Sequence, residues 1–286
     1  MIEKGCNFIY PDEYESLDNE FLSEDLYAKF NERILYRIKS PNPGSYRLKK
    51  PNGLLIFGPS GNGKSILVRQ FAQLTKLPYI VFNGLDIFED NIHNSKGGFN
   101  IVMKMAHKNS PCVVIVENVE TIVPKQTKTT TRFERLEVIS NLSLIQNSGE
   151  NDVFVFATTS RPNEIDAQFA MSGYINELFY ASYPDFSMRL RIIGHFLEKI
   201  VYNKDDVLCN YIAKESDGFT ISDIISLVDD VALKVYLTGS ELSLDLIKQV
   251  INSFHLPTNI LSKKNYDEIN NLLTSKPVNK IIGFHR

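Results

Sequence analysis

The stretch Gly58-Pro59-Ser60-Gly61-Asn62-Gly63-Lys64-Ser65 decides the fold of this 286-residue chain. It has the spacing G-x-x-x-x-G-K-S of a phosphate-binding loop. The apolar run at 54–57 predicts a buried strand before it, and residues 65–71 predict a helix after it. Glycines allow backbone N–H groups to point at phosphate, and a helix N-terminus adds partial positive charge. The stretch therefore predicts a nucleoside triphosphate site rather than a chance glycine-rich turn.

The residues of this loop have separate expected roles. Lys64 is expected to contact the β- and γ-phosphates, and Ser65 to ligate Mg²⁺. The expected cofactors are therefore ATP and Mg²⁺. The residues expected to bind the nucleotide are consecutive in the sequence, namely Gly58, Pro59, Ser60, Gly61, Asn62, Gly63, Lys64, Ser65 and Ile66. Binding alone does not establish that the nucleotide is hydrolysed.

The composition is that of a globular chain with one large domain or two modest ones. Hydrophobic residues make up 43%, and the net charge is −3, which gives no support for a nucleic-acid or acidic-membrane partner. The three cysteines, Cys6, Cys112 and Cys209, are far apart and form no metal or disulfide pattern. We find no 18-residue apolar run and no signal-peptide core, so no membrane insertion is expected. These features predict a cytoplasmic or nuclear protein.

Short apolar runs alternate with helical patterns through the first two thirds of the chain. They predict strands at 54–57, 79–82, 113–116 and 153–157, with a fifth candidate at 178–181. Such an alternation indicates a parallel sheet covered by helices on both faces. Before it, residues 24–38 have a helical pattern within a polar and aromatic lead-in.

After Pro184 the pattern becomes helical only. Helices are expected over 187–201, 205–213, 222–237 and 243–254, and Thr220 with Asp223 resembles a capping box. We therefore expect three parts: a lead-in at 1–50, an α/β nucleotide-binding domain at 51–187 and a small helical lid at 188–286. The basic, polar residues 125–132 predict a solvated loop, or alternatively a loop facing a central pore or a nucleic acid.

Several stretches together resemble the AAA+ ATPases, in the AAA group that includes spastin, katanin and fidgetin. Residues 51–59 (PNGLLIFGP) resemble the family's approach to the phosphate loop, and 110–116 (SPCVVIV) its Walker B strand. Residues 158–162 (TTSRP) resemble the sensor-1 region, and 217–224 (DGFTISDI) resemble the start of a lid helix. The order and spacing of these stretches carry the likeness from 51 to about 255.

The resemblance implies a fold, an assembly and partners. It implies a three-layer αβα phosphate-loop domain followed by a helical lid. It also implies an oligomer, with other AAA+ subunits or a protein scaffold as partners and a protein as a conceivable client. Nucleic acid is not among the partners that it supports.

The departures from the family pattern concern catalysis. Active members end the Walker B strand with Asp-Glu, whereas this chain has Glu117-Asn118. Glu117 keeps a carboxylate that could support the metal together with Ser65. Asn118 cannot accept a proton, and general-base assistance is typically worth about 10²–10⁴-fold in rate. Glu120 is the nearest carboxylate that could reach back.

Further catalytic positions of the family are also changed. Ser160 stands where the sensor-1 asparagine is expected, and residues 167–183 contain no arginine or lysine where the family places its arginine fingers. A finger can be worth about 10³–10⁵ in rate. The pore aromatic is missing as well, because its place falls at 90–92 (DNI). The resemblance also places His195 near an adenine contact, although a surface histidine on a helix is the simpler reading.

Three hypotheses follow. The first is a catalytically weak or inactive AAA+ protein that uses ATP as a structural or regulatory ligand within an AAA+ assembly. The second is an active AAA+ ATPase with Glu117 or Glu120 as base and Arg132 or Arg135 acting in trans. The third is another phosphate-loop enzyme such as a small-molecule kinase, which would need a lid rich in arginine.

Overall fold

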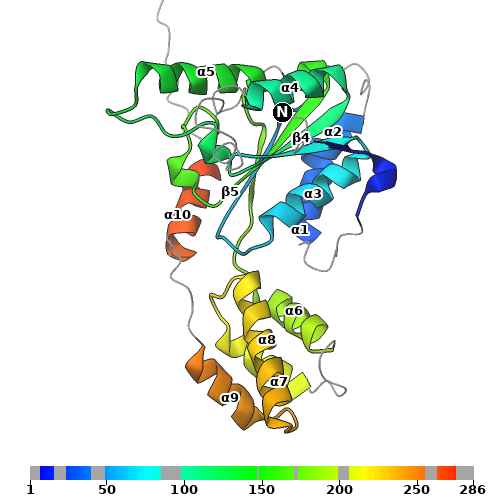
Figure 1. Cartoon of the computed structure of the whole chain (residues 1–286), viewed down its shortest axis with the longest axis vertical. Helices are drawn as coiled ribbons and strands as arrows, with labels where there is room; N and C mark the ends of the chain where they lie inside the picture. The colour runs from blue at the N-terminus through cyan, green and yellow to red at the C-terminus, as the bar shows by residue number, and fades with distance from the viewer. Residues whose placement is uncertain are drawn as a thin grey trace, which may run out of the picture.

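The structure is a computed structural model that describes residues 7–15, 24–39, 49–84, 98–146, 148–170, 173–198, 206–254 and 263–274. These residues form an α/β body with helices on both faces of a sheet, and a separate bundle of helices beside it (Figure 1). The predicted αβα architecture with a helical lid is therefore confirmed. The residues 90–92, expected at the pore, lie outside the described residues.

The described part of the chain contains one six-stranded sheet in the order β1-β3-β4-β5-β2-β6. The strands are β1 (Phe8–Ile9), β2 (Gly53–Phe57), β3 (Tyr79–Asn83), β4 (Cys112–Glu117), β5 (Val153–Thr159) and β6 (Glu177–Tyr180). All five predicted strands are confirmed within one or two residues. The sheet is parallel except at one edge, where the unpredicted β1 pairs antiparallel with β3. The predicted parallel sheet is confirmed, and it carries one antiparallel edge strand that was not predicted.

The order of the strands fixes where a ligand site forms. β5 lies between β2 and β4 and runs parallel to both. The carboxyl ends of β2, β5 and β4 therefore meet at one edge, where open parallel sheets bind their ligands. Phe57, the last residue of β2, pairs in register with Thr159, the last residue of β5.

Alternate residues of the strands enter two separate cores. On one face, Leu54, Ile56 and Phe156 pack with α3 (Lys64–Thr75) and with the N-terminal helical segment. On the other face, Leu55 and Val155 pack with α4 (Gly98–Lys108) and α5 (Arg132–Gln146). This period of two explains why the strands read as continuous apolar runs, since both faces are buried.

The lead-in segment is part of this body. It contains α1 (Glu24–Phe30), a π-helical turn η4 (Asn31–Leu35) and α2 (Tyr36–Lys39), in agreement with the predicted helix. Phe30 has no exposed surface and stacks on Phe71 of α3, with ring centroids 4.2 Å apart. Aromatic pairs of this kind add about 0.5–1.5 kcal/mol beyond the area that they bury.

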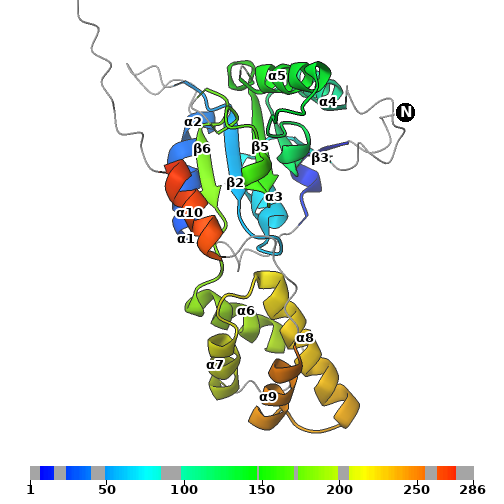
Figure 2. The ribbon, with the colours of Figure 1, turned by 90° about the vertical axis from the view of Figure 1, so that its left-hand side faces the viewer.

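The lid is a bundle with its own hydrophobic core. It consists of α6 (Phe186–Glu198), α7 (Asp206–Glu215), α8 (Ile221–Thr238) and α9 (Leu244–Ser253). The predicted capping box is confirmed, because the Thr220 side chain accepts from the Asp223 N–H while the Asp223 carboxylate accepts from the Thr220 N–H. The box fixes the start of α8, which is the end of that helix nearest the sheet domain (Figure 2).

The last described helix, α10 (Lys263–Thr274), does not join the lid. It lies beside β6 (Figure 2). The Tyr180 hydroxyl of β6 donates to Asp267 Oδ1 at 2.9 Å. The expected helical domain at 188–286 groups α10 with the lid, whereas its contacts are with the sheet domain. No helix among the described residues is long and apolar enough to cross a membrane.

Candidate functional site

A cavity of about 310 Å³ opens at the carboxyl ends of β2, β4 and β5. The lining residues come from the phosphate loop, from the start of α3 and from the ends of β4 and β5. They are Ser60, Gly61, Gly63, Lys64, Ser65, Ile66, Glu117, Asn118, Thr158, Thr159 and Ser160. The fold thus brings together candidate residues that lie about a hundred positions apart in the sequence. Gly58, Pro59 and Asn62 do not line this cavity.

The glycines of the loop are required by its backbone conformation. Gly61 has φ of 83° and Gly63 has φ of 68°, both in the left-handed region that side chains disfavour. A Cβ on Gly63 would meet only Ile221 Cδ1 within 4 Å, at 3.9 Å, so there is free space beside this part of the loop backbone. The N-terminus of the 12-residue helix α3 follows directly. This geometry is suited to anions, because unpaired N–H groups and the helix dipole favour negative charge.

Lys64 lies inside the loop and is only 8% exposed. Its ammonium donates to the Pro59 carbonyl oxygen at 2.6 Å. Burial lowers the pKa of the Lys64 ammonium from 10.5 to about 8, while the nearby Glu120 carboxylate acts in the opposite direction. A buried cation with a single neutral partner is stabilised when an anion arrives. The role expected for Lys64 toward phosphate therefore fits its surroundings.

Asn62 faces the lid and the hinge, which is the segment 181–185 between β6 and α6, instead of the cavity. Its Nδ2 donates to the carbonyl oxygens of Ala181 at 3.2 Å and Ser182 at 3.0 Å, in the segment that leads to the lid. Its Oδ1 accepts from the N–H of Ile221, the first residue of α8, at 3.2 Å. A direct role in nucleotide contact was expected for Asn62, but its side chain joins the loop to two other parts of the molecule.

A second contact ties the loop to the lid. The N–H and the hydroxyl of Ser222 both donate to the Gly61 carbonyl oxygen, at 3.0 and 3.1 Å. Together with the Asn62 contacts, they place the N-terminus of α8 directly on the phosphate loop.

Glu117 and Ser65 are the expected metal ligands, and both line the cavity. The Glu117 carboxylate also pairs with Arg69 of α3, with Nη2 and Oε1 3.2 Å apart. Mg²⁺ in phosphate sites typically takes one or two protein ligands and completes its shell with phosphate oxygens and water. One hydroxyl and one carboxylate at the loop match this requirement. No cluster of three or more His, Cys, Asp or Glu residues suited to a metal occurs in the described ranges.

Asn118 adopts a left-handed conformation with φ of 55°, which asparagine tolerates better than most residues. Its Nδ2 donates to Asn83 Oδ1 at the end of β3, at 3.0 Å. An amide at this point of the cavity wall can orient water but cannot accept a proton from it.

Glu120 lies closer to the cavity wall than its sequence position suggested. Its Oε2 accepts a hydrogen bond of 2.7 Å from the Thr159 hydroxyl at the end of β5. Its charge also acts on Lys64 and on Tyr266. The short 3-10 turn η7 (Val119–Thr121) turns the chain back toward β5 and brings this carboxylate there.

Ser160 lines the cavity at the position expected for sensor 1. Its carbonyl oxygen accepts a hydrogen bond of 2.7 Å from the hydroxyl of Tyr266, which comes from α10. Nothing in the local sequence around Tyr266 indicates this contact, because its partner lies 106 residues away.

Residues 167–183 contain no basic side chain. Glu177 opens β6 and pairs with Arg33, with Nη1 and Oε1 3.5 Å apart. The missing fingers are therefore not replaced by a basic residue of the same segment.

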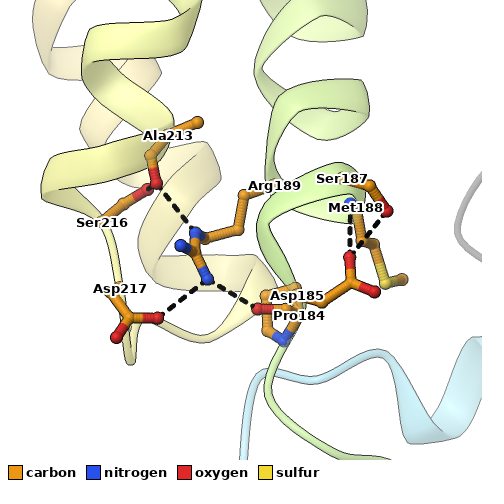
Figure 3. Close-up of polar contacts among 8 residues, drawn as sticks. All are labelled: Pro184, Asp185, Ser187, Met188, Arg189, Ala213, Ser216 and Asp217. Carbon is orange, nitrogen blue, oxygen red and sulfur yellow. Dashed lines mark hydrogen bonds and ion pairs between the residues drawn. The ribbon is translucent and has the colours of Figure 1, made fainter.

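Arg189 organises the hinge between the two domains (Figure 3). It is 6% exposed and donates to the carbonyl oxygens of Pro184 and Ala213 and to the carboxylate of Asp217, at 2.9–3.0 Å. One guanidinium thus joins the hinge to the end of α7 and to the turn before α8. In the same region Asp185 caps α6 by accepting from the Met188 N–H at 2.7 Å.

His195 lies in another part of the lid. It lines a cavity of about 620 Å³ between α6 and α7, together with Arg191, Glu198 and Asp206. None of the residues lining that cavity belongs to the phosphate loop. The structure therefore does not bring His195 into the cavity at the loop.

The comparisons with known proteins agree with this geometry. A family model described as "ATPase family associated with various cellular activities (AAA)" matches residues 54–183. Among solved structures, "Crystal structure of FIGL-1 AAA domain in complex with ADP" is similar with a TM-score of 0.75 and 14% sequence identity. That match covers 93% of this chain and 91% of the other. At this identity the likeness shows the fold alone.

The family model spans β2, the phosphate loop, the ends of β4 and β5 and the strand that leads to the hinge. The solved AAA domain has the same arrangement over nearly the whole chain. Over residues 54–183, this chain is therefore similar to the AAA family of ATPases.

Proposed function

We propose that this chain binds ATP with Mg²⁺ and hydrolyses it weakly or not at all, acting as a structural or regulatory subunit of an AAA assembly. The observation that carries the proposal is the contrast within one cavity. The loop side keeps the glycine backbone, the buried Lys64 and Ser65. The facing wall has an amide, Asn118, that is hydrogen-bonded to Asn83 and cannot act as a base.

When bound, Mg²⁺ would neutralise phosphate charge, held by Ser65 and Glu117. The chain's own residues would position the nucleotide: the loop amides and Lys64 hold its phosphates, and the first residues of α8 close over the loop. Ligand binding between two parts of a protein stabilises the arrangement that it bridges. Bound ATP would thus favour one orientation of the lid and, through it, one assembly state.

The proposed partners are other AAA subunits or a protein scaffold in the cytoplasm or nucleus. The absence of arginine and lysine from residues 167–183 supports this, because the chain has no finger there for a neighbour's nucleotide. It could occupy a place in an assembly without activating the adjacent site.

A second candidate function, an active ATPase with unusual residues, is favoured by one observation. The Glu120 carboxylate reaches the end of β5, next to two residues of the cavity wall. A carboxylate in this position could act on water that Asn118 orients. The small-molecule kinase has less support, because Arg189 is committed to the hinge and Arg191 lines the other cavity.

The deciding experiment measures nucleotide binding and ATP turnover on the same purified chain. We expect Mg²⁺-dependent ATP binding that Lys64→Ala abolishes, with turnover at least about 10³-fold below that of an active AAA motor, since base and finger are both missing. Lys64-dependent turnover at motor rates would refute the first proposal. Its loss in Glu120→Gln, with binding kept, would then establish the second.

A further inference from the structure

The wall of the cavity opposite the loop is fixed from two sides. Thr159 donates to Glu120 and accepts a hydrogen bond of 2.8 Å from the Arg161 N–H. The carbonyl oxygen of Ser160, between them, is held by the Tyr266 hydroxyl of α10. The backbone of a cavity-lining residue therefore depends on a helix that follows the lid in the chain.

The contact is buried and chemically well defined. Among the described side chains of α10, Tyr266 is the most buried, at 4% exposure, while the others are exposed or half-buried. Burial, followed by the nearby Tyr183 and Glu120, raises the pKa of the Tyr266 hydroxyl to about 12, so it remains a donor at neutral pH. Two of the contacts between α10 and the sheet domain are made by this hydroxyl and by the Tyr180–Asp267 hydrogen bond.

The terminal phosphate of a bound triphosphate would lie near this wall. Lysines of phosphate loops contact the β- and γ-phosphates. Lys64 and Thr159 line the same cavity. The Glu120 carboxylate interacts electrostatically with the Lys64 ammonium and accepts a hydrogen bond from Thr159, so the ammonium lies near the end of β5. A diphosphate, which lacks the outermost group, would leave this wall untouched.

We propose that Tyr266 is a positioning residue that sets the Ser160 turn for the terminal phosphate, so that docking of α10 and recognition of a triphosphate are linked. The inference rests on the proposed nucleotide binding. Linkage is reciprocal: if docked α10 favours a triphosphate over a diphosphate, the triphosphate favours docked α10 by the same factor.

The test compares affinities for ADP and for a non-hydrolysable ATP analogue, both with Mg²⁺, in the full chain. Tyr266→Phe removes the hydroxyl and keeps the ring. Loss of one buried hydrogen bond should weaken binding of the analogue about fivefold and leave ADP binding unchanged. The matched control is Tyr180→Phe, which removes the Tyr180–Asp267 hydrogen bond to α10 but keeps the ring stacked on Phe57, with ring centroids 5.3 Å apart in the wild type.

The ratio of the affinities for the analogue and for ADP distinguishes two roles of Tyr266. It changes if Tyr266 sets the Ser160 turn for the terminal phosphate, and it does not change if Tyr266 only attaches α10 to the sheet domain. The inference is overturned if Tyr266→Phe lowers the affinities for ADP and for the analogue equally. It is also overturned if Tyr180→Phe changes the ratio of the two affinities as much as Tyr266→Phe does. In either case, ADP binding by the chain still supports the proposed function. If the wild-type chain binds neither nucleotide, both fall together. Hydrogen exchange gives a second readout in the wild type: the amides of α10 should exchange more slowly with the analogue than with ADP, and equal rates would contradict the linkage.

Discussion

At the scale of single residues, the charge on Lys64 is the property on which the proposed phosphate binding depends. Its ammonium is buried against a carbonyl and has its pKa lowered to about 8. The folded chain thus holds this proton less tightly than the unfolded chain, so between about pH 8 and the ordinary pKa the residue adds stability as pH rises. A bound phosphate reverses the effect, because an opposite charge nearby raises the pKa of an ammonium.

This predicts a pH dependence of nucleotide affinity. Affinity should be level from about pH 7 to 8 and then fall by up to about tenfold per pH unit, since binding must restore one proton to Lys64. Titration of ADP affinity from pH 7 to 9.5 measures it. In Lys64→Arg, whose guanidinium stays charged, any remaining binding should be level across this range. A level profile for the wild-type chain would contradict the prediction.

Helix α8 carries the main contact between the lid and the phosphate loop at the scale of elements. Its N-terminus is fixed by the Thr220–Asp223 box, and its C-terminus ends at Gly239 in the left-handed conformation. The first two residues of the helix donate their N–H groups to Asn62 and Gly61. The cap therefore stabilises the helix and also sets the position of groups that contact the loop.

Removing the cap should have both effects. Thr220→Ala should cost about 1 kcal/mol in the free energy of unfolding, as measured by denaturant titration. It should also weaken ADP binding, because the start of α8 loses its fixed position. Ser243→Ala removes the N-cap of α9, whose hydroxyl accepts from the Leu246 N–H at 3.3 Å, and should cost stability alone. Identical ADP affinities in the two variants would refute the coupling.

At the scale of the whole molecule, the sheet domain and the lid are joined at a hinge that the phosphate loop itself contacts. Asn62 binds both the hinge and α8, and Arg189 binds the hinge from the lid side. Both side chains are buried, at 5% and 6% exposure. A change in the conformation of the phosphate loop is therefore transmitted to the lid through direct hydrogen bonds.

Hydrogen exchange at single amides tests this connection. In Asn62→Ala the N–H of Ile221 loses its acceptor and should exchange at least about fivefold faster, given the usual worth of one hydrogen bond. The neighbouring Ser222 N–H bonds to the Gly61 carbonyl and should change less. The control is Asn141→Ala, another buried asparagine, which donates to Ile122 in the sheet domain at 2.8 Å. Unchanged exchange at Ile221 would show that the lid is held by other contacts.

Much of the fold was predictable because it depends on local patterns. Strands buried on both faces are continuous apolar runs, and the capping box of α8 has a sequence signature of its own. The edge strand β1 was missed because its two residues, Phe8 and Ile9, are half-buried and too few to form a pattern. The candidate catalytic positions Glu117, Asn118 and Ser160 were assigned through the resemblance to the AAA+ ATPases, and the parallel sheet brings them to one cavity.

The sequence by itself determined the phosphate loop, the sheet, the lid and the amide side chain at position 118, since these depend on residue type and short-range spacing. Only the tertiary structure decided which way Asn62 points, where the Glu120 carboxylate lies and that Tyr266 holds Ser160. Each of these contacts joins groups that are far apart in the chain, namely Asn62 with Ile221, Glu120 with Thr159, and Tyr266 with Ser160. Their existence depends on how strands, hinge and terminal helix pack, and no local pattern encodes that packing.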